Sequence, residues 1–258
     1  KKIVRYNKYD KLIVFGPQIA IFLSDFLKKY YKNRFIFDYR DLSIEQKPFL
    51  RNRFIKVLTN SSINVISSPG FKRCLPNNFN YLLSHNFNVD NVRKALNINK
   101  VDINLDINNV KVLTIGGIRD YESNIEVVKA LANKENFQVQ FVGRGHAANS
   151  IEQYTKKQNI KNIEFEGYYP KEKESEYIKQ STFLNIFYPR ILSHDTALSN
   201  RFYNALIYKR PMIVTHDTTQ GDYVEKYQLG LSLMNCENLD IKINAYTTKK
   251  IIKKFKKN

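Results

Sequence analysis

The fold class that the sequence predicts is α/β, with two domains of the same kind in succession. Short apolar runs alternate with amphipathic segments of helical length, first over residues 11–67 and again over 111–233. A stretch rich in Asn and Asp, 75–106, separates the two series. Such alternation is typical of parallel sheets with right-handed crossovers. A chain of 258 residues is long enough to form two cores.

The first series predicts three strands joined by two helices. The strands are expected at 11–15, 35–38 and 64–67, and the helices at 19–31 and 48–59. Polar residues follow the second strand in the turn Asp38-Tyr39-Arg40-Asp41-Leu42. In open α/β sheets, ligands bind beyond the carboxyl ends of the strands. This turn is therefore a candidate part of a binding site.

The second series is longer and follows a connection that carries a short helix near 91–96. Its strands are expected at 111–115, 138–142, 162–165, 183–187, 212–215 and 230–233, and its helices at 124–133, 151–158, 172–180, 199–209 and 221–227. We predict a first domain with linker at 1–105, a second domain at 106–245 and a basic terminal helix at 246–258. The two Rossmann-like domains are expected to face a cleft.

The stretch 181–215 reads as strand, polar loop, helix and strand. Ser199 is a good N-cap for the helix, and Lys209-Arg210-Pro211 ends it with cations and a proline. The helix N-terminus presents unpaired N–H groups beyond the preceding strand, a geometry that favours an anion. Arg201 in the first turn opposes the helix dipole unless an anion is nearby. The alternative is an ordinary surface arginine.

The composition is that of a globular protein with an unusually basic balance. The formal net charge is +18, which indicates a polyanionic neighbour such as phosphorylated ligands, an anionic membrane face or nucleic acid. Alternatively, the positive charge reflects a compositional bias towards lysine that has no functional meaning. No apolar run approaches the roughly 20 residues of a membrane span. The two cysteines form no metal spacing and suit a reducing compartment.

Four pieces in order, 112–117, 141–145, 165–168 and 198–214, are similar to the donor-binding domain of GT-B-fold glycosyltransferases. The resemblance, to members of the capsule and polysaccharide type, implies a hexosyltransferase-like enzyme that needs no metal. It implies transfer from a UDP or GDP sugar, bound as substrate, to a hydroxyl or lipid-linked acceptor in polysaccharide or glycoconjugate synthesis. The first domain is shorter than in that fold, so we expect a trimmed or truncated acceptor side.

The resemblance also implies a set of site residues. The donor-binding candidates are Gly116, Gly117, Arg119, Arg144, Tyr168, Ser199, Asn200, Arg201 and Asn204, and the catalytic candidate on the acceptor side is Asp41. The glycines would let the backbone approach the diphosphate, and the arginines would stabilise it as a leaving group. The family's glutamate, which accepts from the donor ribose, is matched by Asn204. An amide accepts without charge assistance, which puts donor affinity or donor identity in doubt.

Three other classes remain open from the sequence: a nucleic-acid-binding protein, a GT-B-like sugar-nucleotide epimerase and a non-catalytic relative. No helix-turn-helix, zinc finger or aromatic RNA platform is evident, so no nucleic-acid partner is expected. The tail 247–257 places three apolar residues among six lysines. It either packs back on the first domain or attaches reversibly to an anionic membrane surface. We therefore expect a cytoplasmic protein, which under the second alternative is peripheral on the inner membrane face.

Overall fold

The computed structural model describes residues 4, 7, 9–97 and 108–247 of the chain. The chain divides into two compact units. The first unit comprises Lys1–Asn86 and Ile191–Leu198, and the second comprises Phe87–Arg190 and Ser199–Asn258. The predicted boundary near residue 105 and the predicted terminal helix both fall on segments outside the described residues, so both stay predictions.

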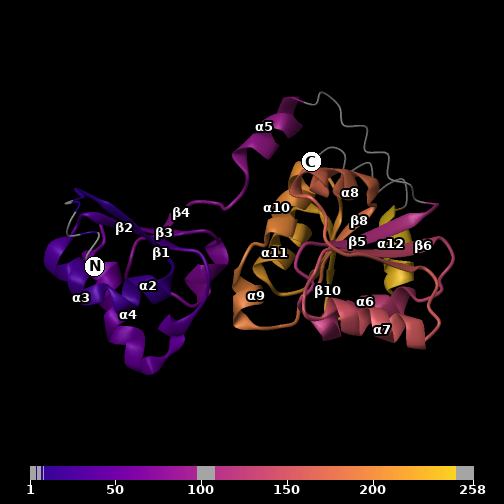
Figure 1. The fold of residues 1–258 in the computed structure, drawn as a ribbon, viewed down its shortest axis with the longest axis horizontal. Helices are drawn as coiled ribbons and strands as arrows, with labels where there is room; N and C mark the ends of the chain where they lie inside the picture. Colours follow the sequence, from indigo (N-terminus) through magenta and orange to yellow (C-terminus); the bar gives the residue numbers. More distant parts are fainter. Residues whose placement is uncertain (1–3, 5–6, 8, 98–107, 248–258) are drawn as a thin grey trace. The chain divides into compact units, whose positions relative to one another are not determined.

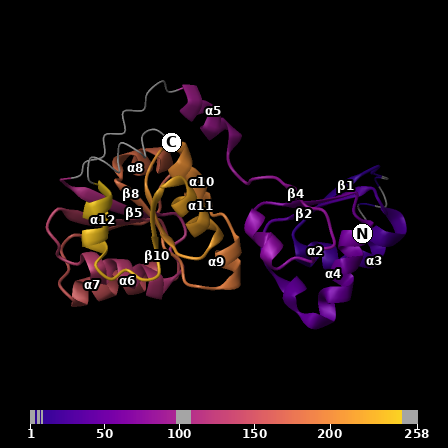
Figure 2. The same ribbon diagram turned by 180° about the vertical axis from the view of Figure 1, so that it is seen from behind.

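The first unit is built on a parallel sheet of four strands in the order β1-β2-β3-β4. The strands are β1 (Leu12–Phe15), β2 (Phe35–Tyr39), β3 (Ile63–Ile66) and β4 (Leu82–Leu83). The helices α2 (Pro17–Phe22), α3 (Ser24–Tyr30) and α4 (Pro48–Asn60) lie together on one face (Figure 2). Because the strand order is monotonic, right-handed crossovers place every connecting helix on the same side.

The core of the first unit is aromatic. Phe37, Tyr39, Phe54 and Phe71 are buried under the helical layer, and their rings meet mostly edge to face. The Tyr39 hydroxyl donates to the buried carboxylate of Glu45 at 2.6 Å. Burial and this bond raise the pKa of Tyr39 well above its ordinary value. The buried hydrogen bond between Tyr39 and Glu45 thus holds the turn after β2 against the core of the first unit.

The second unit is built on a six-stranded parallel sheet (Figure 1). Its strand order is β10-β9-β8-β5-β6-β7. The strands are β5 (Val110–Ile115), β6 (Phe137–Val142), β7 (Ile163–Glu166), β8 (Phe183–Ile186), β9 (Met212–Thr215) and β10 (Gly230–Leu233). The central strands are almost entirely buried on both faces, as expected of a sheet covered on both sides. The strand order reverses between β5 and β8, and such a switch point is where α/β sheets bind ligands.

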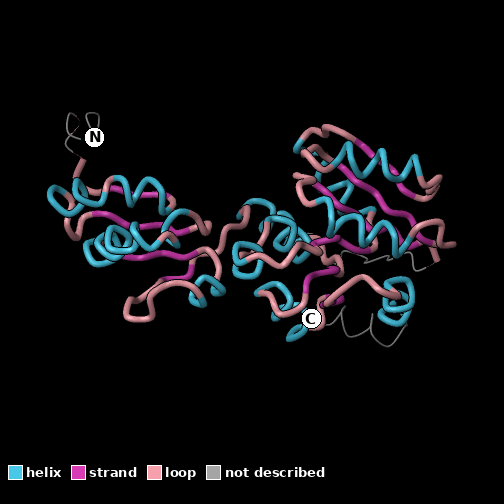
Figure 3. Tube along the Cα trace, turned by 90° about the horizontal axis from the view of Figure 1, so that it is seen from below, coloured by secondary structure: helices cyan, strands magenta, loops and turns pink. Residues whose placement is uncertain are grey.

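Helices cover both faces of this sheet (Figure 3). The helices α6 (Tyr121–Leu131), α7 (Ala148–Lys157) and α12 (Leu239–Thr247) pack together. The helices α8 (Glu174–Gln180), α10 (Asn200–Ile207) and α11 (Thr219–Tyr227) pack on β5, β8, β9 and β10. The helix α5 (Val89–Asn97) contacts α10. In the described part of the chain, no helix is both long and apolar enough to span a bilayer.

The predicted α/β class, with its two parallel sheets, is confirmed, and the differences are local. The helix expected at 19–31 is two helices, α2 and α3, that meet at Leu23. Within the described residues, the sequence did not predict the two-residue strand β4, the five-residue helix α9 (Leu192–Thr196), the helix α12, or the short 3-10 helices at Ile44–Gln46 and Pro69–Arg73. The helix α9 belongs to the first unit, where the Ser68 hydroxyl donates to the carbonyl of Thr196 at 2.5 Å.

Candidate functional site

The loops that follow β5 and β6 pack against each other at glycine residues. Gly143 has φ of 127°, and a Cβ atom there would lie 2.1 Å from the carbonyl oxygen of Gly116. A Cβ atom at Gly145 would lie 1.9 Å from the carbonyl oxygen of Ile118. Only glycine permits approach this close, because any side chain would collide with main-chain atoms that cannot rotate away. The loop Gly116-Gly117 is therefore pressed against the loop after β6.

Arg201, in the first turn of α10, holds this loop from the other side. Its Nε donates to the Ile115 carbonyl at 2.5 Å, and an Nη atom donates to the Gly117 carbonyl at 2.7 Å. The side chain is only 9% exposed. These two carbonyls supply the negative partners that a cation near a helix N-terminus needs. The arginine thereby fixes the Gly116-Gly117 loop directly beside the N-terminus of α10.

The helix α10 begins as predicted. Ser199 caps it, because its hydroxyl oxygen accepts from the Phe202 N–H at 3.2 Å. The same hydroxyl donates to Oε1 of Gln220, at 2.7 Å, which ties the cap to α11. Asn200 follows at the first helical position and is exposed. The Ser199 cap is confirmed, whereas a donor-binding role for Ser199 and Asn200 stays a prediction.

Arg119 lies on the same loop as the paired glycines but is exposed. Its Nε would be 3.2 Å from a Cβ atom at Gly117, so the guanidinium folds over the outer glycine. Among the described residues, no carboxylate pairs with it. The loop therefore presents an available positive charge next to exposed backbone.

A hollow of about 430 Å³ opens at the carboxyl ends of β6 and β7. Its lining includes three charged residues, Arg144, Glu152 and Glu166, and two aromatic residues, Phe141 and Phe165. The rest of the lining is Gly143, Gly145, Ala148, Asn149 and Gly167. Next to it, the Arg144 guanidinium lies 5.5 Å from the ring centre of Tyr168, which is 71% exposed. An aromatic face with a cation above it can accept a flat ring.

A carboxylate that the sequence prediction did not include lies near the glycine loop. Glu174, the first residue of α8, is 8% exposed and accepts from Nδ2 of Asn204 at 2.9 Å. It also accepts from the Tyr169 hydroxyl at 2.8 Å and from the Lys171 ammonium at 2.5 Å. No sequence signal marks Glu174, because Asn204 is 30 residues away.

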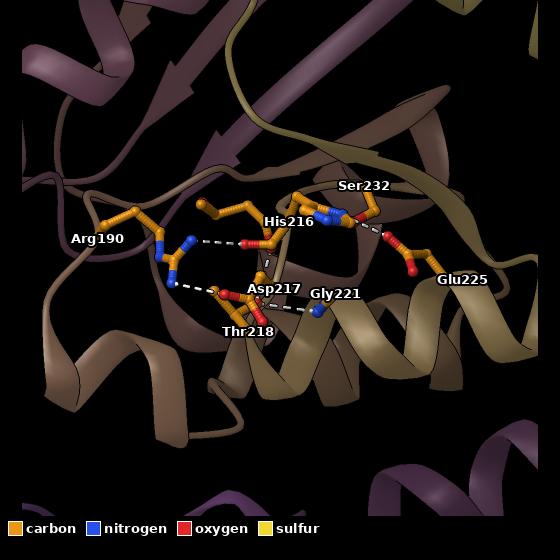
Figure 4. Close-up of polar contacts among 8 residues, drawn as sticks. Arg190, His216, Asp217, Thr218, Gly221, Glu225 and Ser232 are labelled. Carbon is orange, nitrogen blue, oxygen red and sulfur yellow. Dashed lines mark hydrogen bonds and ion pairs between the residues drawn. The ribbon is translucent and has the colours of Figure 1, made fainter.

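A further polar cluster follows β9 (Figure 4). His216 Nδ1 lies 2.6 Å from the carboxylate of Glu225 and 3.3 Å from the hydroxyl of Ser232. Arg190, after β8, donates to the His216 carbonyl and to the carboxylate of Asp217. Bonds from Ser232 and His216 lower the pKa of Glu225. These groups tie the loop after β8 to the loop after β9.

Asp41 lies on the first unit, in the turn between β2 and the short helix at Ile44–Gln46, and is exposed. Its neighbour Asp38 is buried and accepts two bonds from Arg40, at 2.8 and 3.0 Å. Of the two carboxylates, Asp41 is the one open to solvent. Within the described ranges, no three His, Cys, Asp or Glu residues gather in a way that could hold a metal ion.

Comparisons with known proteins identify the fold. No protein-family model matches the chain, and no curated protein matches it. Solved structures do match: the Anabaena protein HepE in complex with UDP aligns with a TM-score of 0.64 at 12% identity, covering 95% of this chain and 71% of that one. Sucrose-phosphate synthase from Thermosynechococcus elongatus aligns with a TM-score of 0.64 at 14% identity, covering 95% and 66%.

A third match is the trehalose-6-phosphate protein from E. coli bound with UDP-2-fluoro glucose. It aligns with a TM-score of 0.67 at 7% identity and covers 99% of this chain and 69% of that chain. Likeness at such low identity shows the fold alone. The chain therefore shares the α/β fold of these solved structures, and the GT-B-like fold that the sequence resemblance implied is confirmed.

Proposed function

We propose that this chain is a glycosyltransferase that binds a nucleoside diphosphate sugar on its second unit. The observation that carries the proposal is the junction at the β5/β8 switch point. There, buried Arg201 fixes the Gly116-Gly117 loop beside the N-terminus of α10. Exposed glycine backbone, a helix N-terminus and an available guanidinium at Arg119 together favour a diphosphate. The UDP that HepE binds supports a uridine donor, and a guanosine donor is the alternative.

The hollow at β6 and β7 would take the nucleobase. It adjoins the glycine junction through Gly143. Tyr168, which follows the lining residue Gly167 and lies under the Arg144 guanidinium, would offer the base a stacking surface beside the hollow. A base there and a diphosphate at Gly116-Gly117 would place the sugar beyond the phosphates. Ser199 and Asn200 would then contribute the cap and the first exposed N–H groups of α10.

The reaction breaks the bond between the sugar's anomeric carbon and the diphosphate oxygen, which leaves as part of the nucleoside diphosphate. Arg119 and the N-terminus of α10 would stabilise the charge that develops there, a role that needs no metal ion. The acceptor hydroxyl bonds to the anomeric carbon and gives up its proton. Asp41, the exposed carboxylate on the first unit, is the proposed acceptor of that proton or of a hydrogen bond from it.

We further propose a hexosyl donor and a sugar or lipid-linked acceptor, in polysaccharide or glycoconjugate synthesis. Six lysines at the end of the chain would favour reversible attachment to the anionic inner face of a membrane. Each lysine would contribute on the order of 1 kcal/mol, and the attraction would fall with salt. Vesicle sedimentation with anionic and neutral lipids tests this: binding that ignores lipid charge refutes the electrostatic part.

The binding proposal is tested by calorimetry with UDP, GDP, UDP-glucose and a GDP-hexose, with and without EDTA. We expect one diphosphate series to bind, to keep its affinity in EDTA and to weaken about tenfold in Arg119→Ala. Lys157→Ala is the matched control, because it removes an exposed charge at the C-terminal end of α7, away from the carboxyl edge of the sheet. Equal affinity in Arg119→Ala and wild type would remove Arg119 from the site.

A further inference from the structure

The Glu174 carboxylate accepts hydrogen bonds from three donors, which come from two different parts of the second unit. Tyr169 and Lys171 come from the segment after β7, and Asn204 comes from α10. A carboxylate can only accept, so the Asn204 amide must turn its NH₂ group toward Glu174. Its carbonyl oxygen then points away from Glu174. Among the described residues, none donates to that oxygen.

The position of this cluster points to one part of a nucleotide. The Tyr169 hydroxyl is 3.9 Å from where a Cβ atom at Gly116 would lie, so the cluster borders the glycine loop. Tyr169 also follows Gly167, which lines the hollow, by two residues. In any nucleoside diphosphate, the ribose lies between the base and the phosphates. A nucleotide with its base in the hollow and its diphosphate at Gly116-Gly117 therefore carries its ribose past Glu174 and Asn204.

We propose that Glu174 is a positioning residue for the donor: it locks the Asn204 amide so that the carbonyl oxygen accepts a hydrogen bond from a ribose hydroxyl. This inference rests on the proposed function, because it specifies how the same site recognises its nucleotide. Because its NH₂ group is bonded to Glu174, Asn204 can offer the nucleotide only its carbonyl oxygen, which is an acceptor. The site consequently selects a ribonucleotide, whose hydroxyls can donate, over a deoxynucleotide that lacks one.

The test compares UDP with 2′-deoxy-UDP and 3′-deoxy-UDP, and GDP with its deoxy forms, by calorimetry on the full chain. Wild type should bind the ribonucleotide about five- to tenfold more tightly than at least one deoxy form, the effect of one hydrogen bond. In Glu174→Gln the side chain can present either an oxygen or an NH₂ group, so the Asn204 amide is free to turn. That preference should fall to about twofold or less.

Two further variants separate positioning from simple structural support. Glu172→Gln makes the same chemical change on an exposed residue of the same segment and should keep the wild-type preference. Asn204→Ala removes the acceptor and leaves Glu174 intact, so it should lose the preference even if Glu174→Gln does not fold. Circular dichroism confirms that each variant is folded before titration.

The possible outcomes distinguish failure of the proposed nucleotide-binding function from failure of the role inferred for Glu174. If wild type binds neither UDP nor GDP, the proposed function fails and this inference fails with it. If wild type binds but shows no preference over either deoxy form, or if Glu174→Gln weakens the ribo and deoxy forms equally, the inference alone is overturned. Loss of the preference in both Glu174→Gln and Asn204→Ala, with Glu172→Gln unchanged, supports it.

Discussion

Replacing Arg201 tests whether a buried guanidinium builds the glycine loop. In Arg201→Met the apolar stem of the side chain is kept, but both donated bonds, to the carbonyls of Ile115 and Gly117, are lost. In Arg201→Lys one ammonium can reach only one of the two carbonyls, since it lacks the fork of donors. We therefore expect stability to fall in the order Arg, Lys, Met.

The magnitude follows from the number and the kind of bonds. A hydrogen bond from a charged donor contributes about 1.5–3 kcal/mol, so two bonds set an upper range of about 3–6 kcal/mol. Removing a guanidinium that is 9% exposed returns part of its desolvation cost. The net loss for Arg201→Met should be about 2–4 kcal/mol, and for Arg201→Lys about half of that.

Urea unfolding, followed by circular dichroism, measures these losses, and Arg119→Met is the matched control. Arg119 is on the same loop but exposed, so its replacement should change the free energy of unfolding by less than about 0.5 kcal/mol. The two arginines should also differ in their effect on ligand binding, because Arg119→Met should weaken diphosphate binding without lowering the free energy of unfolding. Unchanged stability in Arg201→Met would refute the role assigned to its two bonds.

Three further predictions follow from single contacts. Gly143→Ala should destabilise the second unit by at least about 3 kcal/mol in thermal unfolding, since its Cβ would meet the Gly116 carbonyl oxygen at 2.1 Å; Gly167→Ala, with open space around it, should change little. Bonds from Ser232 and His216 lower the pKa of Glu225, so its contribution is present above the unfolded pKa of about 4.3 and is lost as pH falls through the folded value. The small stability advantage of wild type over Glu225→Gln should be present at pH 6 and shrink as the pH falls below the unfolded pKa, and an advantage that grows between pH 6 and more acidic conditions would contradict the sign. Burial raises the pKa of Cys74 to about 11 and of Cys236 to about 12, so iodoacetamide at pH 8 should label both thiols only after unfolding; rapid labelling of either one in the native protein would be inconsistent with this.

The elements predicted from sequence were those with a strong local signal. The strands β5, β6, β8 and β9 consist mostly of apolar residues, and the Ser199 cap precedes a periodic segment. The strand β4 has only two residues, both exposed, so no pattern marks it. The helix α12 did carry a signal, because Leu239, Ile243 and Tyr246 are buried at helical spacing.

The candidate site was predicted in its parts but not in its contacts. The glycines after β5 and the start of α10 could be identified, because turns and caps depend on neighbours in sequence. The carbonyls that accept from Arg201 are 84 and 86 residues away in the sequence. Because no local sequence pattern links residues so far apart, these hydrogen bonds could not be predicted. Glu174 was missed for the same reason, since its bond to Asn204 joins two helices that only the folded sheet brings together.

The most direct measurement of the central claim is hydrogen–deuterium exchange with and without UDP or GDP. If a nucleoside diphosphate binds at the carboxyl edge of the six-stranded sheet, exchange should slow in residues 115–120, 143–149, 167–175 and 199–205. The amino-terminal ends of the same strands should not change. Protection confined to other segments, or none at saturating nucleotide, would contradict the assignment of this edge as the donor site.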